Sequence, residues 1–262
     1  MARIKSLESR HSLQAATHLT DFSLDEALRC WAQRTQVSED DRESLRALPF
    51  SLRTVERDGF IVREGAKPTS CSIILAGAAF RQKVVHNGAR QIISFHFPGE
   101  FIDLQSCLLA VNDHSVQAMT FCKVAAVPKE PLMALADRRP ALAHALWYDT
   151  LVEGAIFREW VVNVGRRNAR ARIAHLLCEL AVRLETSGER GGVYELPITQ
   201  EQIADATGMT PVHTNRTIQA LRKDGLISLN GGRLVVHDWA VLRSIGDFSE
   251  LYLHRHGAAA KK

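Results

Sequence analysis

The sequence has few of the features that mark membrane-anchored, disordered or disulfide-rich chains. It holds no run of the ~18 apolar residues that a membrane-spanning helix requires, and its first residues lack the apolar core of a signal peptide. Of its 262 residues, 46% are hydrophobic and 24% are charged, which is typical of globular proteins. We therefore expect a cytoplasmic protein with no membrane partner.

Cysteine is scarce and irregularly placed. The odd number of five, with no Cys-x-x-Cys pair, argues against a disulfide framework, a zinc site, an iron–sulfur cluster and a dithiol redox motif. A thiol switch at Cys107 or Cys178 remains an alternative, although a lone cysteine is more often a small buried apolar residue.

The sequence also lacks a pattern for metal binding or catalysis. His86, His96 and His114 have no ligand-like spacing, and His254 and His256 lie in the C-terminal tail. No nucleophile with a base and an orienting group, and no glycine-rich phosphate loop, can be recognised. We expect no metal, no cofactor and no catalytic residue. A net charge of +4 permits nucleic acid as a partner without requiring it.

Hydrophobic periodicity divides the chain into four blocks of an α+β protein. A helical extension over residues 1–40 precedes a strand-rich domain over residues 41–136, a long helix over 137–166 and a C-terminal domain over 167–262. Within the second block, short strands at 60–63, 72–77, 80–85 and 90–97 predict an antiparallel barrel or sandwich. Residues 187–192 are predicted to form a loop.

The long helix carries a single apolar seam. Asp137 can cap this helix, and Pro140 is tolerated in its first turn. The seam can pack against the body of its own subunit or against a second copy, and the two different flanking domains favour the second copy. The predicted dimer contact comprises Leu142, Leu146, Asp149, Val152, Ile156 and Trp160.

Two short helices joined by a tight glycine turn are predicted between residues 199 and 225. Thr199 and Gln202 have the pattern of a capping box, and Gly208 stands where a left-handed residue can end the first helix. Thr210 can cap the second helix, which has proline at its first position. This pattern is typical of a helix-turn-helix.

The second helix has a face that can pack and a face that points outward. Helical spacing places Thr214, Thr217, Ile218 and Leu221 on the inner face and Val212, Asn215, Arg216 and Gln219 on the outer face. Arginine can bind guanine, asparagine can bind adenine, and valine can meet a thymine methyl group, so the outer face suits a major groove. Strands at 226–229 and 233–236 around an Asn-Gly-Gly turn complete a winged helix.

With these elements in this order, the chain resembles the CRP/FNR family of bacterial transcription regulators over roughly residues 50–240. The motifs that carry the resemblance lie at residues 59–65, 74–77, 97–103, 198–204 and 215–216. The resemblance implies a cyclic-nucleotide-binding-like β-roll, a homodimer joined along the long helix, and a near-palindromic site with half-sites roughly 34 Å apart. RNA polymerase is the further partner expected of such a regulator.

The resemblance also implies which residues contact DNA. Arg216 matches the usual base-reading arginine, whereas Val212 stands where many members carry Glu and Asn215 where others carry Ser or Gly. The preferred half-site is therefore expected to differ from the best-known ones. The expected DNA-binding residues are Thr199, Gln200, Thr210, Val212, His213, Asn215, Arg216, Gln219 and Arg233.

The family's effector motif is poorly matched. Leu104 replaces the Glu that accepts from the ribose hydroxyl, and His114 replaces the Arg that neutralises the cyclic phosphate. We expect neither cyclic AMP sensing nor an iron–sulfur cluster, since only Cys30 lies near the N-terminus. The candidate effector pocket comprises Phe101, Asp103, Leu104, His114 and Ser115. Two alternatives remain, a ligand-binding regulatory protein whose winged helix contacts proteins, and an enzyme.

Overall fold

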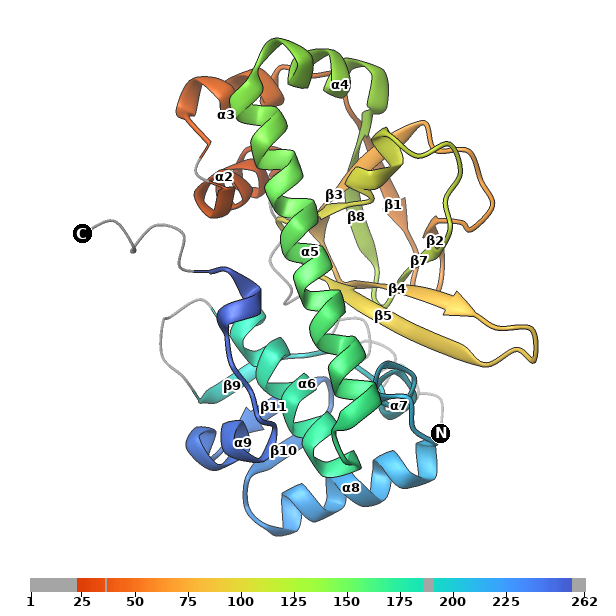
Figure 1. Cartoon of the computed structure of the whole chain (residues 1–262), viewed down its shortest axis with the longest axis vertical. Helices are drawn as coiled ribbons and strands as arrows, with labels where there is room; N and C mark the ends of the chain where they lie inside the picture. Colours follow the sequence, from red (N-terminus) through yellow and green to blue (C-terminus); the bar gives the residue numbers. More distant parts are fainter. Residues whose placement is uncertain (1–22, 36, 186–190, 256–262) are drawn as a thin grey trace, which may run out of the picture. The chain divides into compact units, whose positions relative to one another are not determined.

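The computed structural model describes residues 23–35, 37–185 and 191–255, and the chain divides into two compact units (Figure 1). One unit comprises residues 1–81 and 95–150, and the other comprises residues 82–94 and 151–262. Parts of the predicted N-terminal extension and of the predicted loop at 187–192, together with His256, lie outside the described residues.

The first unit contains the predicted strand-rich domain. The strands and helices of this domain are α2 (Leu24–Thr35), α3 (Glu39–Arg46), β1 (Ser51–Val55), β2 (Phe60–Val62), β3 (Ser70–Ala76), β4 (Ala79–Val84), β5 (Arg90–His96), β6 (Phe101–Ile102), η1 (Leu104–Cys107), β7 (Ser115–Ala118), β8 (Cys122–Pro128) and α4 (Lys129–Arg138). Residues 82–94, which include the end of β4 and most of β5, are assigned to the second unit. Each of the strands predicted from the sequence is present, with small shifts at its ends.

Two antiparallel sheets enclose the core of the β-roll. One has the strand order β1–β8–β3–β6 and the other has the order β2–β7–β4–β5. Side chains alternate along β3, so that Ile74 packs between the sheets with Val116 and Val124. Its neighbour Ile73 points the other way, into a second apolar layer.

The second apolar layer joins the N-terminal helices to the β-roll. Trp31 of α2 is fully buried, and its ring packs edge-on against Phe101 at a centroid distance of 5.1 Å. Leu45 of α3 and Leu132 of α4 belong to the same cluster. The helical extension is therefore part of the core of this unit, and α3 crosses the boundary that was expected at residue 40.

The long helix begins later than the sequence predicted. Asp137 does not cap it, because this residue lies inside α4, and the chain turns at Arg139, which has a non-helical backbone. The long helix α5 (Pro140–Arg166) starts with proline at its first position, where the missing N–H costs no helical hydrogen bond. Figure 1 shows α5 as one continuous green ribbon.

The second unit contains the predicted winged helix-turn-helix. Its further elements are α6 (Ala169–Leu184), β9 (Gly192–Glu195), α7 (Gln200–Thr207), α8 (Pro211–Lys223), β10 (Ile227–Asn230), β11 (Arg233–Val236), α9 (Trp239–Ile245) and η2 (Leu251–Leu253). The predicted hairpin pairs β10 with β11, and β9 adds a third strand on the free side of β11. The sequence reading missed β9, α9 and η2.

Candidate nucleic-acid interface

The first helix of the helix-turn-helix is fixed by its capping residue. The Thr199 hydroxyl accepts a hydrogen bond of 3.1 Å from the Gln202 backbone N–H, and the Gln202 side chain accepts one of 2.9 Å from the Thr199 backbone N–H. This is the predicted capping box. Gly208 ends the helix with φ +64°, a conformation that a side chain would disfavour.

The second helix, α8, divides into the two faces that the sequence predicted. Its inner residues, Thr214, Thr217, Ile218 and Leu221, are buried. Its outer face exposes Val212, His213, Asn215, Arg216 and Gln219, with Val212 71% exposed. Thr210 caps the helix by accepting from the His213 backbone N–H at 3.3 Å. The outward face is therefore polar around one large exposed apolar side chain.

Asn215 and Arg216, two residues of this face, differ in their hydrogen bonding within the chain. The Asn215 amide donates a hydrogen bond of 2.6 Å to the side-chain oxygen of Gln200, which joins the start of α7 to the outer face of α8. Arg216 is exposed, and no side chain or carbonyl in the described part of the chain binds its guanidinium. All five donors of Arg216 are consequently available to an acceptor outside this unit.

The wing carries the remaining predicted contact. Arg233 begins β11 and is exposed, but its Nε donates a hydrogen bond of 2.8 Å to Glu195 of β9. An exposed pair of this kind is weak, so a phosphate can displace the carboxylate. Arg233 is therefore a poorer candidate contact than Arg216.

The predicted effector pocket contains a buried ion cluster in the first unit. Asp103 is 2% exposed and adopts the left-handed conformation with φ +63°. Its Oδ1 lies 2.6 Å from Nε2 of His114 and 3.2 Å from Nη2 of Arg81. Burial acts to raise the pKa of Asp103, but the hydrogen bond from His114 and the charge of Arg81 outweigh it and hold that pKa below its usual value.

The other predicted pocket residues do not converge on a common cavity. Phe101 packs against Trp31 in the apolar layer, and Leu104 packs against the same cluster. The Ser115 hydroxyl accepts a hydrogen bond of 3.0 Å from the Glu64 backbone N–H. Asp103 and His114 are in direct contact, with Oδ1 and Nε2 2.6 Å apart. Arg81 was not predicted as part of this cluster, because the residue pattern of its strand does not indicate that an arginine points into the protein.

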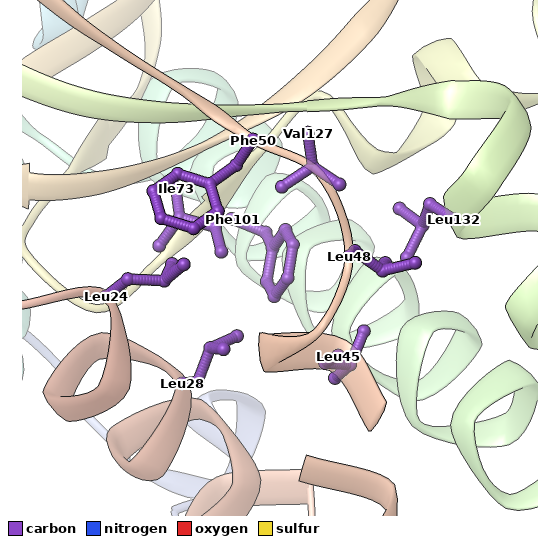
Figure 2. Close-up of a pocket in the computed structure, with 9 residues that line it drawn as sticks. All are labelled: Leu24, Leu28, Leu45, Leu48, Phe50, Ile73, Phe101, Val127 and Leu132. Carbon is purple, nitrogen blue, oxygen red and sulfur yellow. The ribbon is translucent and has the colours of Figure 1, made fainter. Parts of the chain in front are cut away.

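The first unit also contains an apolar pocket between its helices and the β-roll. Figure 2 shows side chains from α2, α3, α4 and the sheet that point toward one another around it. They are Leu24, Leu28, Leu45, Leu48, Phe50, Ile73, Phe101, Val127 and Leu132. None of these side chains can bind a phosphate or a sugar hydroxyl, so the pocket lacks the chemistry of a nucleotide site.

Two of the six residues of the predicted dimer seam are buried within their own chain. Leu142 is fully buried in the apolar layer, and Trp160 is buried with its indole hydrogen-bonded within its own chain. The other four positions, Leu146, Asp149, Val152 and Ile156, are half-buried. Leu142 and Trp160 have almost no surface left for a second chain, so the prediction is wrong for these two residues.

The described part of the chain offers neither a membrane span nor a metal site. No described helix is both long enough and apolar enough to cross a bilayer. Among the described His, Cys, Asp and Glu side chains, no group of three or more is placed to hold a metal ion.

Comparison with known proteins defines the class to which this architecture belongs. The family model of the cyclic nucleotide-binding domain matches residues 52–139, and that of the Crp-like helix-turn-helix domain matches residues 171–245. The solved structure of FixK2 from Bradyrhizobium japonicum is similar, with a TM-score of 0.70 and 24% identity over 76% of this chain and 98% of that chain. The chain belongs to the CRP/FNR family of transcription regulators.

Curated relatives are of the same kind. The transcriptional activator protein FnrL of Cereibacter sphaeroides is 29% identical over 76% of this chain and 82% of the relative. The nitrogen fixation regulation protein FixK of Azorhizobium caulinodans is 29% identical over 66% of this chain and 70% of the relative.

Proposed function

We propose that two copies of this chain bind a near-palindromic duplex site and regulate transcription from it, reading bases with the outer face of α8. The observation that carries the proposal is the outer face itself, where Arg216 is exposed and unengaged beside the Asn215–Gln200 pair. A guanidinium can bind O6 and N7 of guanine together, which supports Arg216 as the main base-reading residue. Thr199, Gln200, Thr210, His213, Gln219 and Arg233 are proposed as supporting contacts.

The pairing of two copies is proposed to use the face of α5 opposite the predicted seam. Within one chain, Trp147, Leu151 and Val161 are 64%, 51% and 60% exposed, and Val162 is also exposed. At about 100° per residue, these four positions fall within an arc of roughly 100°. We call them the outer stripe of α5. Exposed apolar side chains on one face of a helix, here Trp147 with Leu151 and Val161 with Val162, suit a protein interface, and a second outer stripe is their simplest cover.

RNA polymerase is proposed as a further partner. FnrL, one of the relatives described above, is named a transcriptional activator protein. A regulator that activates a promoter has to favour polymerase at that promoter, and direct contact between the two proteins is the simplest way to do so.

The test is binding-site selection from random duplexes with the full chain, followed by native mass spectrometry of the selected complex. We expect two chains per duplex and a selected sequence with two inverted half-sites about one helical turn apart, roughly 34 Å. A complex with a single chain, or no enrichment of any sequence, would contradict the proposal.

A further inference from the structure

Two of the five cysteines lie together in the first unit, although they are far apart in the sequence. Cys71 is on β3 and is buried in the apolar layer beneath the N-terminal helices. Cys107 is the last residue of η1, is half-buried, and packs against the same layer. The two thiols are close enough to share a hydrogen bond. Cys107 is therefore not the lone cysteine that the sequence suggested.

The two thiols are not equivalent. The hydrogen bond from Cys71 lowers the pKa of Cys107, and the positive charge of Lys129 at the start of α4 acts in the same direction. The same hydrogen bond and its burial raise the pKa of Cys71. The groups with opposing effects on Cys107 are its own burial and the carboxylates of Asp103 and Glu130. Cys107 is thus the more acidic and more accessible thiol of the pair.

This asymmetry matches the two roles in thiol oxidation. The thiolate is the form that attacks an oxidant, and it must be accessible. A second thiol in contact with the first can then capture the oxidised sulfur as a disulfide. The other described cysteines lack this arrangement. Cys178 is fully buried and burial raises its pKa strongly, and burial also raises the pKa of Cys122, to about 11.

We propose that Cys107 and Cys71 form an oxidisable dithiol that reacts with hydrogen peroxide or another small peroxide and closes to a disulfide between η1 and β3. The Cys107 thiolate attacks one peroxide oxygen, the O–O bond breaks, and hydroxide leaves, which gives a sulfenic acid at Cys107. The Cys71 sulfur then attacks the Cys107 sulfur. Its proton and the sulfenic hydroxyl leave as water, so peroxide is reduced and the two thiols are oxidised.

The test uses the full-length reduced protein treated with hydrogen peroxide, blocked with N-ethylmaleimide and digested with trypsin without reduction. Trypsin cuts between the two cysteines, so the disulfide joins two peptides. Cys122 lies in the same tryptic peptide as Cys107, because residues 91–122 contain no Lys or Arg and the next cleavage site is Lys123. Fragment ions therefore have to place the bond at Cys107. We expect a Cys71–Cys107 bond that disappears on treatment with dithiothreitol.

Variants separate the two roles. Cys71→Ala keeps a small apolar residue in the core and should leave Cys107 as a sulfenic acid that dimedone captures. Cys107→Ser should leave Cys71 reduced. Cys30→Ser removes a half-buried thiol on α2 and serves as the matched control, which should form the bond as the parent does. A parent protein that forms no Cys71–Cys107 bond in excess peroxide, or that joins Cys107 to Cys122 or Cys30 instead, overturns the proposal.

Discussion

The indole Nε1 of Trp160, near the end of α5, donates a hydrogen bond of 2.9 Å to Oε2 of Glu179 on α6. Glu179 is fully buried, and its burial raises its pKa. Its carboxyl group also lies 2.8 Å from the Tyr252 hydroxyl of η2 and 3.4 Å from Arg183. Three segments of the second unit therefore meet at one carboxyl group, and the indole is the contact from the long helix.

The network continues from Tyr252 to His175. The His175 Nδ1 lies 3.1 Å from the Gly246 carbonyl, and its Nε2 lies 3.1 Å from the Tyr252 hydroxyl. A carbonyl oxygen can only accept, so a neutral His175 carries its proton on Nδ1. The Tyr252 hydroxyl donates its proton to Oε2 of Glu179, so its contact with His175 links the imidazole to the buried carboxyl group. Burial raises the pKa of Glu179 and lowers the pKa of His175.

We expect Trp160→Phe to destabilise the second unit by about 1–3 kcal/mol, because the buried Glu179 loses a donor that nothing replaces. The matched control is Trp147→Phe on the same helix. Trp147 is exposed, so this change should stay within about 0.5 kcal/mol in the isolated subunit. Urea unfolding at low protein concentration, followed by circular dichroism, measures both. Equal effects of the two substitutions would show that the indole hydrogen bond contributes nothing.

The second unit should become less stable as the pH is lowered, because of His175. Burial lowers the pKa of His175 to about 4 in the folded chain, aided by the charge of Arg167, although Glu159 and Asp247 act to raise it. The unfolded value is about 6.5. The stabilisation is therefore complete above pH ~6.5 and is lost as pH falls toward ~4, by about 2 kcal/mol between pH 7 and 5.

The comparison that isolates this effect is the parent against His175→Gln, with unfolding free energies measured at both pH values. Glu179 contributes to the pH dependence of stability with the opposite sign, because its raised pKa favours the folded state as pH falls. This contribution is common to both proteins. A parent protein that loses no more stability than His175→Gln between pH 7 and 5 would contradict the assignment.

In the first unit, Asp103→Asn should destabilise the β-roll by about 3–5 kcal/mol. The change removes the charge of a buried carboxylate that lies 3.2 Å from the buried Arg81 guanidinium. Asp113→Asn is the matched control, because Asp113 contacts the other ring nitrogen of His114 at 2.6 Å but its side chain is 80% exposed. Thermal unfolding of the three proteins tests the difference. Similar melting temperatures for the two variants would show that the ion cluster does not stabilise the domain.

Placing a charge on the outer stripe of α5 should weaken pairing of the chains. Val161→Glu buries a carboxylate in the proposed interface, so we expect the dimer dissociation constant to rise at least about tenfold, or about 1.4 kcal/mol. Val241→Glu changes another exposed valine, on α9, and should leave dimerisation unchanged. Sedimentation velocity over a concentration series measures both constants. If the Val161→Glu protein dimerises as tightly as the parent, the outer stripe is not part of the dimer interface.

The helix-turn-helix was predictable because its signals are local. The capping box at Thr199, the left-handed turn at Gly208 and the two faces of α8 each depend on residues a few positions apart, and all are confirmed by the structure. The strands of the β-roll were predictable for the same reason, since short alternating segments between turns leave few alternatives.

What the sequence could not supply depends on contacts between distant segments. The long helix has apolar residues on opposite sides, and periodicity does not tell which side packs within the chain; burial of Leu142 and Trp160 settles that question. The engagement of Arg81 with Asp103 and the meeting of Cys71 with Cys107 likewise join residues from separate strands and loops. Asp137 was misassigned because the sequence pattern did not reveal a separate helix, α4, that runs through this residue to Arg138.

The most direct test of the account compares the affinity of the parent, Arg216→Ala and Arg233→Ala for the selected duplex and its single-base variants. We predict that Arg216→Ala costs about 1–3 kcal/mol on the selected site and loses discrimination at one base pair, with little change on unrelated DNA. Arg233→Ala should weaken binding to all sequences alike, and it should lower the number of counterions released on binding by about one, measured as the slope of affinity against salt concentration. An Arg216→Ala protein that distinguishes bases as the parent does would contradict base reading by α8.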